Sequence, residues 1–193
     1  MNTLAAAAFG QFSTTALTGA GLAVGLSLLA VDHYTWWKGS GGGAAAAGGG
    51  ASAKDIKALI PTWFGIAYGV LMVGCPAGAL GIISGMLRWG GNTFGGFVMS
   101  AFTGQTAPTV ASASAPTLTW EGALVVTALT LTLWALRKKF PQETRRKFKR
   151  GVWIGSLLTI GTGVFVYLGT LVVPTVNELG AQLLGSVVNG TFL

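Results

Sequence analysis

Long runs of apolar residues alternate with short polar segments along this chain. The apolar runs cover about 12–31, 61–87, 120–136 and 151–173, and each is close to the length that an α-helix needs to cross the roughly 30 Å hydrocarbon core of a bilayer. Pro61 suits a first helical turn, whereas Pro76 predicts a bend inside the second run. The pattern therefore predicts an all-α integral membrane protein with four transmembrane helices.

The segments between these runs predict the rest of a single membrane domain over 1–193. Residues 39–53 read as a Gly/Ala linker, and 137–150 as a basic cytoplasmic loop. Residues 90–119 predict an external loop, whose part 90–104 either lies on the membrane or re-enters it. In the tail 174–193 the apolar residues recur at helical spacing, which predicts an amphipathic interfacial helix.

Composition and charge support a membrane location. The chain is 51% hydrophobic and only 9% charged, against about 25% charged in an ordinary soluble domain. Eight of its 12 Lys and Arg residues lie in 137–150. The positive-inside rule then places 32–60 and 137–150 in the cytoplasm, leaves Arg88 outside, and puts both termini outside a bacterial inner membrane. The uncharged first 31 residues predict an uncleaved first helix rather than a signal peptide.

The residue counts exclude several kinds of chemistry. One histidine and one cysteine cannot form a Cys/His zinc site, an iron–sulfur cluster, a paired-histidine haem site or an intramolecular disulfide. The five acidic residues form no pair close in sequence, and no hydrolase, kinase or dinucleotide motif occurs. The sequence therefore predicts a protein that is not an enzyme, with no catalytic residue, no cofactor and no metal site.

Small residues recur at every fourth position of the second apolar run, which is the pattern of a helix that another helix approaches closely in a membrane. Two interpretations remain open: packing within the chain, and contact between subunits. The residues of this helix-packing ridge are Gly65, Gly69, Val73, Ala77, Gly81 and Gly85, with Gly74 and Gly78 beside them.

The basic loop carries two clusters of cations separated by Phe140, Pro141, Gln142, Glu143 and Thr144. One interpretation is that the cations fix the topology and bind anionic lipid headgroups. The other is contact with nucleic acid or an acidic partner protein. The cations are Arg137, Lys138, Lys139, Arg145, Arg146, Lys147, Lys149 and Arg150.

These features favour a non-catalytic membrane subunit that packs into a larger assembly, such as secretion, conjugation or phage-type DNA-transfer machinery. Two alternatives stay open. One is a self-assembling pore, because the chain resembles phage holins in being small, polytopic and basic on one side. The other is an accessory subunit of an energy-transducing complex. A transporter is less favoured, because the two halves of the sequence show no repeat and the span interiors hold no charged residue.

Overall fold

The computed structural model describes residues 16–42, 56–75, 78–112, 117–159 and 164–189. The described part of the chain is mainly helical, with two short antiparallel strands and short connecting turns, so the all-α class is confirmed. The elements are β1 (Ala16–Thr18), α2 (Gly19–Gly42), the 3₁₀ turn η1 (Ile56–Leu59), α3 (Ile60–Gly74), α4 (Ala79–Thr103), β2 (Thr109–Ser112), α5 (Trp120–Leu136), α6 (Gln142–Leu158) and α7 (Val164–Val188).

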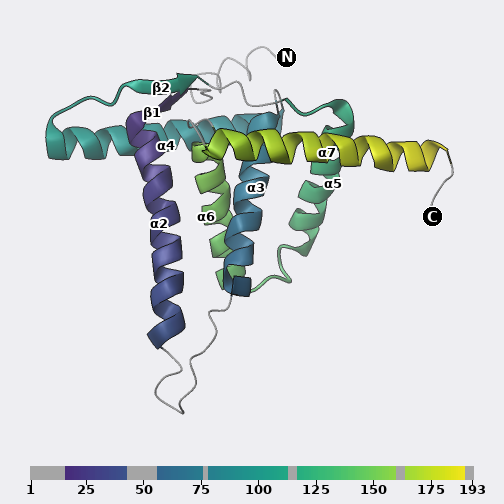
Figure 1. Cartoon of the computed structure of the whole chain (residues 1–193), viewed down its shortest axis with the longest axis horizontal. Helices are drawn as coiled ribbons and strands as arrows, with labels where there is room; N and C mark the ends of the chain where they lie inside the picture. The colour runs from purple at the N-terminus through teal and green to yellow at the C-terminus, as the bar shows by residue number, and fades with distance from the viewer. Residues whose placement is uncertain (1–15, 43–55, 76–77, 113–116, 160–163, 190–193) are drawn as a thin grey trace.

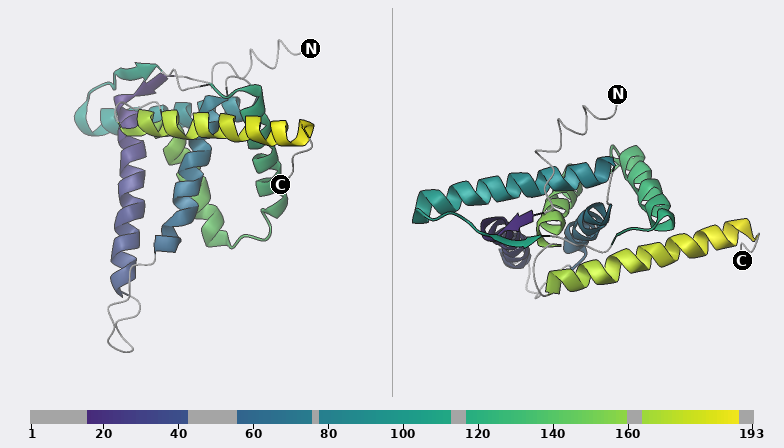
Figure 2. Two further views of the ribbon diagram at one scale, coloured as in Figure 1. Left: turned by 45° about the vertical axis from the view of Figure 1, so that its right-hand side comes forward. Right: turned by 90° about the horizontal axis from the view of Figure 1, so that it is seen from above.

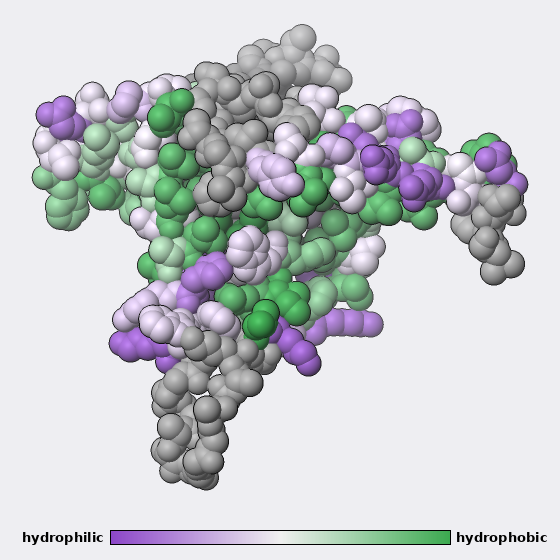
Figure 3. Space-filling model, in the orientation of Figure 1, coloured by the Kyte–Doolittle hydropathy of each residue, from purple (hydrophilic) through white to green (hydrophobic). Residues whose placement is uncertain are grey.

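Helices α2, α3, α5 and α6 stand upright, and α4 and α7 lie across one end of them (Figure 1). We call α4 and α7 the crosswise helices. The opposite end holds η1, the C-terminal part of α2 and the start of α6, and we call it the basic end. In Figure 3 hydrophilic groups gather at this end below an apolar band over the upright helices.

The two halves of the chain have the same architecture. Each half descends through one upright helix, returns through a second and continues into a crosswise helix, in the order α2, α3, α4 and then α5, α6, α7. Seen along the upright helices, the halves are related by an approximate two-fold rotation about the central α3–α6 pair (Figure 2, right). The two halves therefore repeat in their architecture, although their sequences show no clear repeat.

Helices α3 and α6 pack at the centre of this repeat through glycines on both sides. A methyl group at Gly65 would overlap the carbonyl oxygen of Phe148, and one at Gly151 would overlap that of Thr62. Four residues further along, Gly69 and Gly155 repeat the contact against the carbonyl oxygens of Val152 and Ile66. Two Gly-xxx-Gly motifs thus face each other, which allows the two backbones to touch.

On each crosswise helix, an asparagine forms hydrogen bonds with the backbone of the segment that precedes an upright helix. Asn92 of α4 accepts a hydrogen bond from the Thr18 amide (3.0 Å) and donates one to the carbonyl oxygen of Ala16 (3.0 Å). Asn177 of α7 accepts one from the Thr119 amide (3.0 Å) and donates one to the carbonyl oxygen of Thr117 (3.4 Å). The repeat is therefore marked by a few matched side chains, whereas the rest of the two halves differs.

The predicted second span, 61–87, is not one helix. Helix α3 ends at Gly74, and α4 begins at Ala79 in a different direction after Gly78, whose φ of +89° lies in the left-handed region. Residues 76 and 77 lie outside the described residues. The predicted fourth span, 151–173, also divides between α6 and α7, because α7 turns across the bundle and buries Val173.

The predicted residue ranges of three further segments are wrong. The predicted external loop 90–119 is helical up to Thr103, because Gly91 and Gly95 provide close contacts to Leu157 and Ala20 rather than breaks. The predicted basic loop 137–150 is helical from Gln142 on. The predicted tail helix begins upstream of 174, because α7 continues through Pro174. The predicted linker 39–53 lies mostly outside the described residues, and the helix over 120–136 is confirmed.

Two described helices are long and apolar enough to cross a membrane, Ile56–Gly74 and Tyr167–Val188. These two helices support membrane association. The prediction of four transmembrane helices is not confirmed. α5 is apolar but shorter, and α6 is basic over its first half.

Candidate functional site

The predicted lipid-binding or partner-binding cations divide into three groups at the basic end. Arg137 lies over the ring of Trp134 at 4.7 Å, and Lys138 and Lys139 are exposed in the following turn. Lys147 and Arg150 point to the α2 side of α6, where both contact acids. The remaining cations, Arg145, Arg146 and Lys149, lie together with Gln142 around an open hollow of about 310 Å³ on the surface of α6. We call it the basic cavity.

The α2 side of α6 holds a polar cavity of about 410 Å³. Arg150 forms an ion pair with Oδ1 of Asp32, which is 6% exposed, and the second oxygen of Asp32 has no partner among the described residues. Lys147 binds Glu143 at 2.9 Å, and this hydrogen bond and positive charge hold the pKa of Glu143 below its usual range. The ion pair between Asp32 and Arg150 therefore joins α2 to α6.

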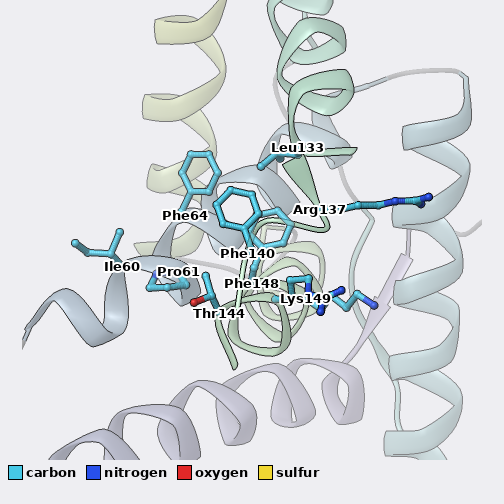
Figure 4. A pocket seen from close by; sticks show the side chains of 10 residues that line it. Ile60, Pro61, Phe64, Leu133, Arg137, Phe140, Thr144, Phe148 and Lys149 are labelled. Carbon is cyan, nitrogen blue, oxygen red and sulfur yellow. The ribbon is translucent and has the colours of Figure 1, made fainter. Parts of the chain in front are cut away.

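The opposite side of the central pair holds an apolar cavity of about 350 Å³ between α3, α5 and the start of α6. Figure 4 shows the rings of Phe64, Phe140 and Phe148 gathered in it, with the guanidinium of Arg137 directed away from the rings. Phe148 also packs against Tyr68, whose hydroxyl is 2.8 Å from that of Thr130 on α5. Thr144, Arg145 and Lys149 complete the lining.

The polar and apolar cavities occupy equivalent places in the two halves. Aligning the matched glycines and asparagines makes most of their lining residues correspond. The pairs are Asp32 and Leu133, Trp36 and Arg137, Ala58 and Thr144, Leu59 and Arg145, Thr62 and Phe148, Lys147 and Pro61, and Arg150 and Phe64.

The two cavities differ because the ion pair has no counterpart in the second half. Where Arg150 binds Asp32, the equivalent residues are Phe64 and Leu133, which cannot attract each other by charge. The contact between α2 and α6 also uses Gly25, which lies against Leu157 and Leu158. The equivalent contact of α5 with α3 is made by Val126. Without an ion pair, the second cavity is lined mainly by apolar and aromatic side chains.

The predicted packing ridge divides at the break between α3 and α4. Gly65 and Gly69 pack within the chain against α6, which is the first of the two open interpretations for these two positions. Gly74 is buried and its carbonyl oxygen accepts a hydrogen bond from the Leu118 amide (2.9 Å). On the other side of the break, Gly78 precedes α4, Gly81 lies against the carbonyl oxygen of Cys75, and Gly85 is buried; Ala77 lies outside the described residues.

Several structural residues carried only weak sequence signals. Asp32 begins the segment 32–60 that the sequence places in the cytoplasm, and nothing in the sequence indicates Arg150 as its partner. Asn92 and Asn177 lie in segments that contain other polar residues. The repeated pairs Leu17-Thr18 and Leu118-Thr119, each with a glycine three residues after the threonine, are a weak signal of an internal repeat.

Comparison with protein families, with curated proteins and with solved structures finds no match for this chain.

Proposed function

We propose that the chain is a multi-pass protein of the bacterial inner membrane, in which α2, α3, α5 and α6 cross the bilayer. The basic end then faces the cytoplasm, according to the positive-inside rule. The crosswise helices and both termini lie on the outer side. Tryptophans near the basic end, Trp63 of α3 and Trp134 of α5, support this orientation because they are half exposed at the level expected for an interface.

The crosswise helices make up the difference between the length of the upright helices and the thickness of the membrane. The upright part of α2 above Asp32 spans about 20 Å, and α5 spans about 25 Å, at about 1.5 Å per residue. Both fall short of a hydrocarbon core of roughly 30 Å. A helix lying flat adds about 10 Å, so α4 and α7 would occupy the outer edge of the bilayer. Their placement across the bundle favours this arrangement over α7 crossing the membrane by itself.

Within the membrane we propose a non-catalytic subunit of a larger assembly, such as secretion, conjugation or DNA-transfer machinery. The observation that carries this proposal is the pair of helical arms. The C-terminal ends of α4 and α7 extend beyond the upright helices in opposite directions (Figures 1 and 2), and the large apolar side chains on and next to these ends are exposed. These are Phe94, Phe97 and Phe102 on α4, and Leu179, Leu183, Val187 and Val188 on α7.

The arms offer surfaces on which neighbouring membrane helices can pack, in addition to lipid. Phe97 and Phe102 are 72% and 86% exposed, and Val188 is 79% exposed. The rest of the chain provides a rigid base for them, because the touching backbones of α3 and α6 hold the two halves together. Rigid elements that project apolar arms suit a packing role.

Transport is a second candidate, favoured by the internal repeat. Parallel repeats related by an axis along the membrane normal occur in transporters. Against it, the ion pair of Asp32 and Arg150 lies at the level where α3 begins, because Ala58, Leu59 and Thr62 line the same cavity. A substrate site of the usual kind would use ionisable residues near the centre of the membrane.

The assembly proposal is tested by gentle solubilisation from the native membrane, followed by mass measurement and identification of all proteins that co-purify. A reproducible set of different proteins supports the proposal. A particle that contains only copies of this chain supports the holin-like alternative, which also predicts that expression alone collapses the membrane potential. A monomer without partners contradicts the proposal. Orientation is tested by membrane-impermeant labelling of Lys139→Cys and Gln105→Cys in a Cys75→Ser background, where only Gln105→Cys should react from outside.

A further inference from the structure

The basic cavity and the apolar cavity adjoin each other at the start of α6. Arg145 and Lys149 line both of them. One side of these two cations therefore faces a polar hollow with Gln142 and Arg146, and the other side faces the aromatic rings of Phe64, Phe140 and Phe148. A ligand that fills both spaces must be an amphiphile.

The charge of the basic cavity selects an anion. Its lining contains three cations and Gln142 but no carboxylate. The nearby acid, Glu143, binds Lys147 and lines the polar cavity on the other side of α6. Its charge also acts on Arg146, but among the described residues it forms no ion pair with Arg145 or Lys149. Gln142 is also the first residue of α6, and the amide groups and dipole of a helix N-terminus attract negative charge.

The shape and position of the apolar cavity select a hydrocarbon chain. It lies between α3 and α5 on the membrane-facing side of the basic end, and Ile60, Pro61 and Leu133 extend its lining beyond the aromatic rings. In the equivalent place of the first half, Asp32 and Arg150 form an ion pair that would exclude such a chain. The second half has no such pair and provides an apolar wall instead.

We propose that the two cavities together bind one anionic phospholipid. Its phosphate lies between Arg145 and Lys149 at the start of α6, and one of its acyl chains enters the gap between α3 and α5. The proposal rests on the membrane location proposed above, because that location supplies the lipid. It goes beyond general attraction of anionic headgroups to a basic loop, since it assigns one lipid to one place and gives no role in binding to Lys138 and Lys139.

The headgroup contacts are tested with the purified full chain in a mild detergent, by native mass spectrometry during titration with palmitoyl-oleoyl phosphatidylglycerol or phosphatidylcholine. We expect a first phosphatidylglycerol that binds at least about tenfold more tightly than phosphatidylcholine and than any later phosphatidylglycerol. Arg145→Gln/Lys149→Gln should weaken this first event by about tenfold or more. The control Lys138→Gln/Lys139→Gln removes the same charge from the same end and should leave it within about twofold.

The acyl-chain contact is tested by filling the apolar cavity. Leu133→Trp should weaken the first phosphatidylglycerol by about tenfold, whereas Leu131→Trp, on the exposed surface of the same helix, should have no effect. Each variant is first compared with the unmodified chain by thermal unfolding. If Leu133→Trp does not fold, phosphatidylglycerol with six-carbon chains replaces it as the probe, and it should bind about tenfold more weakly than the long-chain lipid.

Four results would overturn the assignment. They are an equal loss in the two charge variants, equal binding of phosphatidylcholine, no effect of either the filled cavity or the shortened chains, and displacement of the lipid by a short DNA oligonucleotide at lower concentration than by free phosphatidylglycerol. The last result would assign the basic cavity to nucleic acid. Co-purification of partners does not depend on this site, so the lipid site and the assembly role can fail separately.

Discussion

The touching backbones of α3 and α6 make replacement of Gly69 by alanine a sharp test of the fold. A methyl group there would overlap the carbonyl oxygen of Val152 and come within 3.0 Å of the Ser156 nitrogen. All of these are backbone atoms, which cannot rotate away as a side chain can. The two helices must therefore move apart to accept the methyl group.

The cost follows from the weaker dispersion attraction between the separated helices. A gap of 0.5–1 Å removes about a quarter to a half of the attraction of each atom pair, and on the order of 40 pairs at about 0.15 kcal/mol each would lose roughly 1.5–3 kcal/mol. Alanine regains about 1 kcal/mol through its higher helix propensity. We expect Gly69→Ala to lower the free energy of unfolding by about 0.5–2 kcal/mol, which overlaps the range measured for overpacked cores.

A matched control has the opposite sign. Gly96 lies inside α4, and a methyl group there meets nothing within 4 Å. Gly96→Ala should therefore raise the free energy of unfolding by about 0.5–1 kcal/mol. Both variants are measured by tryptophan fluorescence while the fraction of a denaturing detergent in mixed micelles is increased.

The repeat adds a second criterion. Gly155 makes the equivalent contact against Ile66, so Gly155→Ala should cost about as much as Gly69→Ala. One separation of the helices accommodates both methyl groups, and the double variant should cost less than the sum of the two single variants. Stabilisation by Gly69→Ala as large as that by Gly96→Ala, or full additivity of the two central variants, would refute the backbone contact.

Three other substitutions test single contacts, each by the same unfolding measurement. Arg150→Gln leaves the buried carboxylate of Asp32 without its partner and should lower the free energy of unfolding by about 1–3 kcal/mol, less than for a fully buried pair because Arg150 is partly exposed. Adding Asp32→Asn should restore part of this loss, and full additivity of the two substitutions would contradict the ion pair. Arg88 is buried with Nε unpartnered among the described residues, and its equivalent in the second half is the buried Val173, so Arg88→Met should be neutral or stabilise by about 1 kcal/mol; a clear destabilisation would show that Arg88 has a partner. Asn177→Ala removes two hydrogen bonds to the segment before α5 and should cost about 1–3 kcal/mol; faster hydrogen exchange confined to residues 117–122 would locate the effect, and unchanged exchange would argue against it.

Local sequence signals are sufficient where one helix has polar neighbours at both ends. α5 has the limits that the apolar run 120–136 predicts, because Thr119 caps its first turn by accepting a hydrogen bond from the Gly122 amide and the cations from Arg137 on end the apolar run. The apolar run 61–87 gives a wrong prediction. A hydropathy pattern counts apolar residues, and it cannot tell a straight helix from two helices at an angle when both parts are equally apolar.

The packing glycines are recognisable in the sequence as a class but not as contacts. The spacing of Gly65 and Gly69 predicts close approach by another helix, and the approach is made by α6, whose own Gly151 and Gly155 give a weak signal because they follow a basic segment. Conversely, Gly91 and Gly95 resemble breaks in a loop until α6 and α2 are seen to lie against them. A glycine has the same appearance in a sequence whether it ends a helix or admits a neighbour.

By itself, the sequence determined the helical class, the helix over 120–136 and the concentration of cations in one segment, because each depends on residues close together along the chain. Only the tertiary structure decided that α4 and α7 lie across the bundle, that the halves repeat about α3 and α6, and that a buried ion pair stands where the other half has Leu133 and Phe64. The physical reason is that these features depend on contacts between distant residues. Whether a helix changes direction, packs closely on its neighbour or leaves a cavity depends on the side chains that face it from other helices. Only the tertiary fold determines which side chains those are.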